Sequence, residues 1–96
     1  MEDLKVKHDS RNHLFYADVK GGKAELDYDR HGDKYVEYKS TFVPKEARHE
    51  GIGSTLAKQA LEYAAKHDLK VKPTCPFVKD VMDHDGKYRK LAYEVF

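Results

Sequence analysis

The stretch from Arg48 to Gly53 could bind a phosphate group. Its spacing is Arg48-x-x-Gly51-x-Gly53, with an apolar-alternating segment before it and a long helical pattern after it. Glycine lets the backbone turn tightly and approach a ligand closely. The first amides of the following helix have no internal partners and carry a partial positive charge, which favours an anion. Two glycines alone are typical of any loop before a helix, but the strand and helix patterns around them favour phosphate binding.

Cys75, the single cysteine of the chain, is the second residue with potential chemistry. Proline is frequent at the first position of a helix, so Pro76 predicts a helix that starts there and is capped by Cys75. A sulfur at a helix N-terminus faces unpaired amides, which favours the thiolate form and predicts a reactive thiol. A lone cysteine is about as often a small buried apolar residue, so both interpretations remain open at this point.

The histidines and one strand carboxylate are weaker candidates. None of the six histidines forms an i,i+4 pair, and none lies with the cysteine at the spacing of zinc ligands, so the sequence predicts no metal site. His49, inside the glycine turn, either contacts a phosphate or is an ordinary surface side chain. Glu37 is either a general base or an exposed carboxylate on the strand.

Length, charge and cysteine content limit the class of protein. A chain of 96 residues is enough for one domain with a modest core, so residues 1–96 are expected to form a single domain. The net charge is +1 and the basic residues are dispersed among acidic ones, which argues against nucleic acid and membrane surfaces as partners. One cysteine excludes an intramolecular disulfide. The acidic start has no apolar run behind it, so we expect no signal peptide, no membrane span and a cytoplasmic protein.

The first half of the chain alternates apolar and polar residues, which is typical of β-strands. Turn sequences separate the alternating segments, and Gly21-Gly22 supplies the positive φ that a hairpin turn requires. In the last of these strands, alternation places Ser40 and Phe42 on the same face as Tyr38. The predicted strands are Leu4–Lys7, His13–Val19, one that includes Ala24–Tyr28, and Tyr35–Val43, which form an antiparallel meander.

The second half of the chain predicts a β-α-β unit. A crossover helix makes its two flanking strands parallel, and ligands bind beyond their carboxyl ends, where both Gly51 and Cys75 fall. The fold class is therefore predicted as α+β, with an antiparallel meander, a β-α-β crossover with a parallel strand pair, and short C-terminal helices. The predicted elements are a helix over about residues 51–67, a strand over Leu69–Thr74, a helix from Pro76, and a last short helix or turn over Tyr88–Tyr93.

The motif residues resemble a known family. Arg48-x-x-Gly51-Ile52-Gly53 resembles the Arg/Gln-x-x-Gly-x-Gly/Ala signature of the GNAT superfamily, the acetyl-CoA-dependent N-acetyltransferases, in which backbone amides of the signature bind the CoA pyrophosphate. Residues Ser40 to Tyr88 are similar to a small, shortened GNAT group with a Thr-x-Val-Pro-like strand end and a Cys-x-Phe/Tyr segment. Here these are Thr41-Phe42-Val43-Pro44 and Cys75-Pro76-Phe77.

The resemblance implies an N-acetyltransferase that binds acetyl-CoA or coenzyme A. The acetyl group would go to an amine of an unknown acceptor, a small molecule or a protein or peptide. In GNAT folds, backbone amides at the end of the strand before the glycine turn hold the pantetheine, and the turn holds the pyrophosphate. The implied cofactor-binding residues are Phe42, Val43, Arg48, His49, Glu50, Gly51, Ile52, Gly53, Ser54 and Cys75.

The resemblance also implies that Cys75, Tyr88 and Ser40 are the catalytic candidates. Cysteine is frequent at the position of Cys75, near the acetyl group, and a tyrosine such as Tyr88 often donates a proton to the leaving thiolate. Many relatives have a histidine facing the active site at the position of Ser40, so serine removes an obvious general base. The amine attacks the thioester either directly or after Cys75 has taken the acetyl group.

The chain departs from full-length GNAT enzymes between its first two strands, where Asp9–Asn12 replaces a helical segment that shapes the acceptor site. The acceptor side is therefore expected to be open, which leaves a protein or peptide amine as an acceptor. A CoA-binding module without useful catalysis, which Ser40 favours, is an alternative. So is a sheet-based interaction domain, which the strand aromatics favour but which does not require the glycine motif. The sequence names neither the acceptor nor the oligomeric state.

Overall fold

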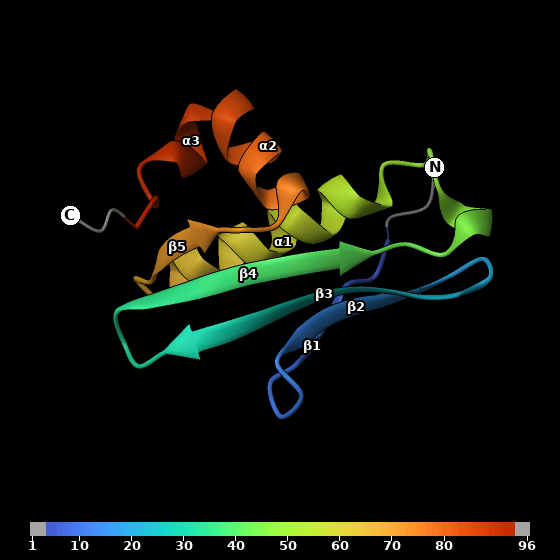
Figure 1. Cartoon of the computed structure of the whole chain (residues 1–96), viewed down its shortest axis with the longest axis horizontal. Coiled ribbons are helices and arrows are strands. Elements are labelled where there is room, and N and C mark those ends of the chain that lie inside the picture. The colour runs from blue at the N-terminus through green and yellow to red at the C-terminus, as the bar shows by residue number, and fades with distance from the viewer. Residues whose placement is uncertain (1–3, 94–96) are drawn as a thin grey trace.

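The computed structural model describes residues 4–93 as a five-stranded sheet with helices on one face (Figure 1). The strand order is that of the chain, and only the last pair of strands is parallel. The predicted α+β class, with its meander and parallel pair, is confirmed. The elements are β1 (Lys7–Asp9), β2 (Leu14–Val19), β3 (Gly22–His31), β4 (Tyr35–Phe42), the 3-10 helix η1 (Lys45–Ala47), α1 (Ile52–Lys66), β5 (Lys70–Pro73), α2 (Pro76–His84) and α3 (Gly86–Arg89).

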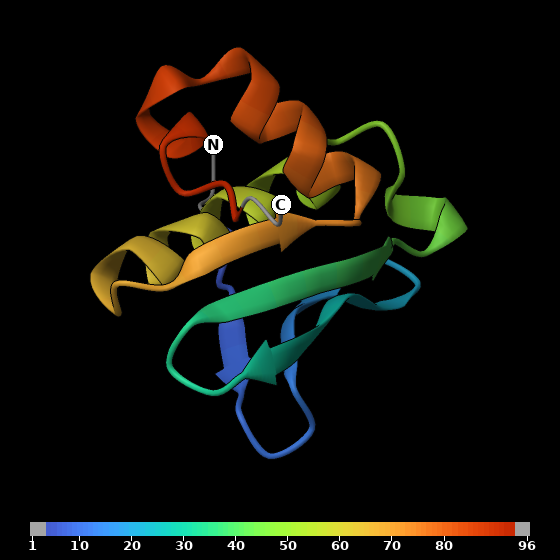
Figure 2. The same ribbon diagram turned by 60° about the vertical axis from the view of Figure 1, so that its left-hand side comes forward.

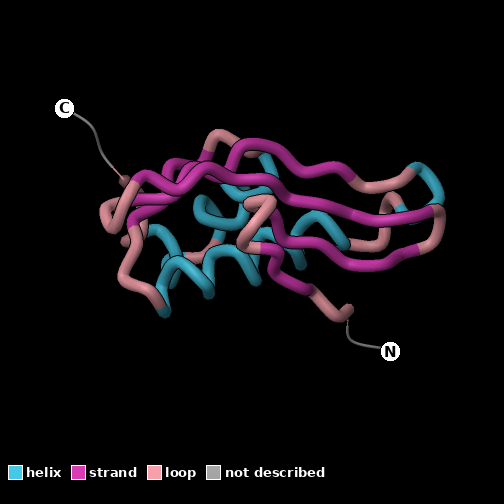
Figure 3. The backbone as a smooth tube through the Cα atoms, turned by 90° about the horizontal axis from the view of Figure 1, so that it is seen from below, coloured by secondary structure: helices cyan, strands magenta, loops and turns pink. Residues whose placement is uncertain are grey.

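The core lies between the sheet and the helices, mainly α1. The tube view shows the helices along one side of the strands (Figure 3). Alanines on α1 have small side chains and good helix propensity, so the helix packs closely on the strands. Buried alternate residues of β3 and β4 meet them, while the side chains between face outward. No helix among residues 4–93 is long and apolar enough to cross a membrane. Fully buried core residues include Leu26, Val36, Tyr38, Leu56, Ala57, Ala60, Leu61, Ala64 and Val71.

The first strand lies later than predicted. It spans Lys7–Asp9 and not Leu4–Lys7. His8 pairs with Phe15 across β1 and β2, and the two rings stack with their centroids 4.3 Å apart. The His8 imidazole also hydrogen-bonds the Tyr28 hydroxyl, with 2.6 Å between Nε2 and Oη. Aromatic packing around His8 therefore positions this strand, and simple apolar alternation did not predict it.

A β-bulge in β4 changes which residues face the core. Tyr28 pairs with Tyr38, but the preceding Asp27 pairs with Ser40, so Lys39 is an extra residue in β4. A bulge reverses the alternation of the residues that follow it. The prediction that Ser40 and Phe42 share the face of Tyr38 is therefore wrong, and Thr41 turns toward the core.

Candidate functional site

The turn before α1 is bent by residues with left-handed backbone conformations. Gly51 is the N-terminal cap of α1 with φ 74° and ψ 15°. Among residues 4–93, no atom beyond its chain neighbours lies within 4 Å of the position that a Cβ would take. His49 has φ 70°, which is uncommon for a residue other than glycine. The glycine of the predicted turn is thus required by its backbone conformation.

The N-terminal amides of α1 precede the first hydrogen bond of the helix. That bond runs from the Thr55 amide to the Gly51 carbonyl, 3.0 Å long, and the Thr55 hydroxyl bonds the same carbonyl. No side chain in the part of the chain that the structure describes accepts a bond at this cap. The amides of Ile52, Gly53 and Ser54 therefore form a positively polarised end that suits an anion.

Gly53 has a different role from Gly51. Its backbone is not left-handed, and a Cβ built on it would lie 2.5 Å from the ring of Phe77 in α2. Glycine at this position therefore allows α1 and the start of α2 to lie close together. Phe77 itself is 42% exposed, so its ring borders the turn from the side of α2.

Arg48 is the C-terminal cap of η1, directly before the turn, and its side chain reaches back toward the end of β4. Its Nε donates a hydrogen bond to the carbonyl of Val43, with a length of 3.2 Å. This bond holds an exposed cation between the strand end and the N-terminus of α1. Phe42, the last residue of β4, is 56% exposed and adds an apolar surface at the same end of the sheet.

The parallel strands part at Tyr38. The β4–β5 pairing ends where Tyr38 meets Pro73, and the next contact is a 2.8 Å bond from the Cys75 amide to the Tyr38 carbonyl. Beyond it, residues 39–42 of β4 have no partner on β5. Figure 2 shows the N-termini of α1 and α2 on the side where these strands end. The structure thus brings the glycine turn, the parted strands and Cys75 to one end of the molecule.

Cys75 caps α2, as the sequence predicts, but its side chain is wholly buried. Its sulfur makes no cap hydrogen bond and lies 3.0 Å from the Thr41 hydroxyl. Thr41 reaches it because the β4 bulge turns this residue inward. The alternation of residues along the strand predicts the opposite face for Thr41, so sequence reasoning missed this contact. Burial restricts the access of reagents to the thiol, and its reactivity stays a prediction.

The hydroxyl groups of Ser40 and Tyr88 form their hydrogen bonds with residues other than Cys75. The Ser40 hydroxyl donates to Asp27 over 2.5 Å on the outer face of the sheet. The Tyr88 hydroxyl donates to Glu62 over 2.5 Å and links α3 to α1. Burial, followed by the Glu62 carboxylate, raises the pKa of Tyr88. Tyr88 would have to exchange Glu62 for a leaving thiolate to donate its proton there.

The strand order, the bent glycine turn and the parted parallel pair occur together in a fold that is already represented among solved structures. The solution NMR structure of a GCN5-like protein from Staphylococcus aureus matches with a TM-score of 0.70 and 23% sequence identity. The match covers 100% of this chain and 94% of that chain. At this identity the likeness shows the fold alone.

Sequence comparison identifies the family. The sequence model of the GCN5-related N-acetyl-transferase family matches residues 14–91, and the chain belongs to this family. Protein NATD1 of Homo sapiens is 35% identical over 78 residues, which cover 79% of this chain and 69% of that protein. Protein NATD1 of Danio rerio is also 35% identical over 78 residues, with 79% and 71% covered. The resemblance inferred from the motifs is confirmed, while the name of these relatives states no activity.

Proposed function

We propose that this protein is an acetyl-CoA-dependent N-acetyltransferase whose acceptor is an amine of a small molecule, a protein or a peptide. The observation that carries the proposal is the left-handed Gly51 turn followed by an N-terminus of α1 without a side-chain cap. This arrangement suits a pyrophosphate, because amides and the helix end both favour negative charge. Family membership supports the same cofactor.

The cofactor would extend from the glycine turn toward Cys75. Amides between His49 and Ser54 would hold the pyrophosphate, with Arg48 adding a positive charge. The unpaired edge of β4 up to Phe42 and Val43 would offer backbone groups to the pantetheine. The acetyl end would then lie where β4 and β5 part, beside the Thr41 hydroxyl and the Cys75 sulfur, which contact each other.

Transfer requires an unprotonated acceptor amine that attacks the thioester carbonyl carbon. The carbon–sulfur bond then breaks, the CoA thiolate leaves, and the amine loses a proton to a base or to water. Glu37, one residue before the point where the strands part, is a candidate base. Its side chain is 21% exposed and accepts a 2.6 Å bond from the Thr74 hydroxyl.

The alternative function is a CoA-binding module with little or no catalysis. The observation that favours it is Ser40, whose hydroxyl is bonded to Asp27 on the outer face of the sheet. The motif resemblance implies a histidine at this position, and serine does not supply its basic nitrogen. Turnover assays with a panel of amines and lysine-containing peptides separate the two functions. Product formation that depends on enzyme concentration supports the transferase, whereas tight binding without product supports the module.

Replacing Arg48 by alanine should weaken acetyl-CoA binding by about 1–3 kcal/mol, the range of a charge-assisted hydrogen bond. Calorimetric titration with acetyl-CoA measures this change. Arg89→Ala is the matched control, because Arg89 also bonds a backbone carbonyl, that of Asp83, but lies in α3. Equal affinity of the Arg48 variant and the wild type for acetyl-CoA would show that Arg48 does not contribute to the phosphate site.

Replacing Cys75 by alanine should leave most of the turnover, because we expect the amine to attack acetyl-CoA directly. An acetyl-Cys75 intermediate would require the sulfur, so its loss would then remove nearly all activity. Steady-state kcat/KM with the best acceptor of the panel decides between the two routes. The alkylation rate of wild-type Cys75, measured with and without acetyl-CoA, is the companion test. Slower alkylation in the presence of acetyl-CoA would support an acetyl end near the sulfur. An alkylation rate that acetyl-CoA does not change would argue against it.

A further inference from the structure

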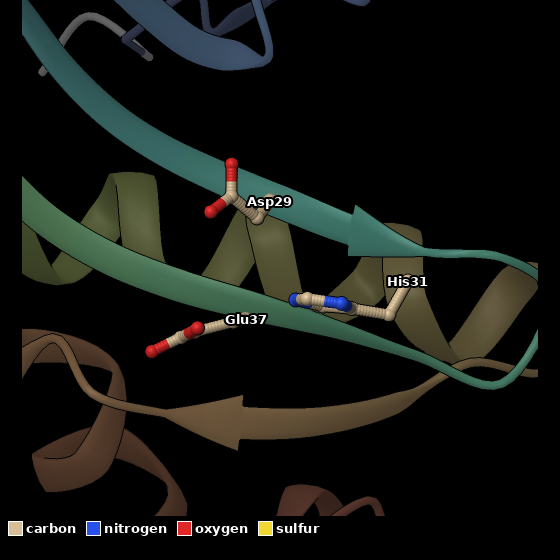
Figure 4. Close-up of side chains that lie close together, drawn as sticks. All are labelled: Asp29, His31 and Glu37. Carbon is tan, nitrogen blue, oxygen red and sulfur yellow. The ribbon is translucent and has the colours of Figure 1, made fainter.

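Three side chains with metal-binding atoms converge on the outer face of the sheet, away from α1. Asp29 and His31 are two residues apart on β3, so their side chains project from the same face. Glu37 on β4 pairs directly with Asp29. One ligand atom from each residue lies within 4.8 Å of the other two (Figure 4).

The chemistry of the three donors selects a class of ion. An imidazole nitrogen with two carboxylate oxygens suits Zn²⁺ and related transition metals, whereas Mg²⁺ and Ca²⁺ prefer oxygen atoms alone. Around zinc, with bonds of about 2.0–2.2 Å, neighbouring ligand atoms lie about 3.3 Å apart. The side chains therefore need to close by at most about 1.5 Å, and Asp29, with its side chain 50% exposed, has room to rotate.

Neighbouring side chains orient two of the three ligands. The Thr74 hydroxyl donates a 2.6 Å hydrogen bond to Oε2 of Glu37. The ring of Tyr35 stacks on His31, with 4.5 Å between centroids and 13° between planes, and Tyr93 stacks on Tyr35 in turn. Such contacts with residues around a metal site hold the ligands in place and reduce the cost of binding.

Two lysines compete with a metal ion for the same oxygens. The Lys39 ammonium lies 3.4 Å from Oδ2 of Asp29, and that of Lys72 lies 4.0 Å from Oε2 of Glu37. Both lysine side chains are about half exposed, and ion pairs of this kind contribute little to stability. A divalent ion with direct bonds to the carboxylates can displace them, and removing a lysine should strengthen metal binding.

We propose that Asp29, His31 and Glu37 bind a divalent transition-metal ion such as zinc, with water completing its coordination. Sequence spacing predicted no metal site, because the ligands come from two strands and meet only through the β3–β4 register. The proposal goes beyond acetyl transfer, and zinc binding can be measured without acetyl-CoA. It shares Glu37 with the proposed transfer site, where a bound metal ion would prevent this carboxylate from acting as the base. Since ligand groups must be deprotonated, affinity should fall on acidification.

The test is a zinc titration of chelator-treated protein by calorimetry, with NMR of the histidine ring nitrogens as a second readout. The wild type should bind one zinc ion and shift the ring signals of His31 first. Asp29→Asn, His31→Gln and Glu37→Gln should each lower affinity at least about tenfold. Magnesium and calcium at the same concentration should produce no comparable binding.

Two further variants make the test specific. His84→Gln is the matched control, because His84 lies beside Asp80 on α2 and offers another exposed imidazole and carboxylate pair. This variant should bind zinc like the wild type. Lys39→Met should raise affinity several-fold, since it removes the competing ammonium from Asp29.

Several results would overturn the proposal. One is the absence of saturable binding up to about 1 mM zinc. Another is unchanged affinity in His31→Gln, and a third is a zinc response that starts at His84 or Cys75 and leaves His31 unchanged. The Glu37 side chain is partly buried, at 21% exposed. An unchanged circular dichroism spectrum is therefore required of each variant to show that it is folded.

Discussion

Valine at position 53 should weaken acetyl-CoA binding by at least about tenfold, or about 1.4 kcal/mol. The β-branched side chain would stand where the backbone of the turn is proposed to approach the phosphates. It would also meet the ring of Phe77, because even a Cβ at Gly53 lies 2.5 Å from it. Overpacking of this kind costs about 1–3 kcal/mol of stability, so binding and unfolding must both be measured.

A second substitution separates the two effects. In Gly53→Val combined with Phe77→Ala, the ring is absent, so stability should recover while acetyl-CoA binding stays weak. Gly86→Val is the matched control, because Gly86 lies in α3 and a Cβ there meets no atom within 4 Å in the described part of the chain beyond its own neighbours. If the double variant recovered both stability and binding, Gly53 would be a packing residue and the cofactor would approach elsewhere.

Alanine at position 38 should lower the free energy of unfolding by about 3–5 kcal/mol, the range for removing a large buried aromatic side chain. Tyr38 is fully buried, and its hydroxyl donates a 2.5 Å bond to the carbonyl of Ala60 in α1. Burial raises the pKa of Tyr38, so its hydroxyl stays neutral. Because a domain is stable by only about 5–15 kcal/mol, urea unfolding should show a large fall in midpoint.

Tyr38→Phe is the control for the hydroxyl group. It keeps the ring in the core and should cost only about 0.5–1.5 kcal/mol, the net value of one hydrogen bond. A similar loss in both variants would mean that the hydrogen bond, and not the volume of the ring, holds α1 on the sheet. Tyr38 also marks the point where the strands part, since its carbonyl accepts the Cys75 amide. Its core side chain therefore supports the geometry of the proposed acetyl site.

Local sequence signals predicted most of the elements and the place of the proposed cofactor site. Proline at Pro44 and Pro76 and glycine at Gly51 act on the backbone of their own neighbourhood, so their effects are visible in the sequence. The strand–turn–helix order then placed Gly51 and Cys75 at the carboxyl ends of a parallel pair. The helix cap at Cys75 is correct for the same reason.

Tertiary pairing decided which side chains meet. Lys39 enters β4 as an extra residue only because of its register with β3, and this register sends Ser40 outward and Thr41 toward Cys75. No alternation of apolar residues within β4 contains that information, because a bulge depends on the partner strand.

Tertiary packing also decided the role of Gly53 and brought together the three side chains on the outer face of the sheet. The chain by itself determined that Gly51 and Gly53 flank a helix start, but only the packing of α2 assigned Gly53 to the ring of Phe77. Likewise, Asp29, His31 and Glu37 have no recognisable ligand spacing until β3 and β4 pair. Backbone conformation is decided by nearby residues, whereas side-chain contacts depend on segments that the fold brings together.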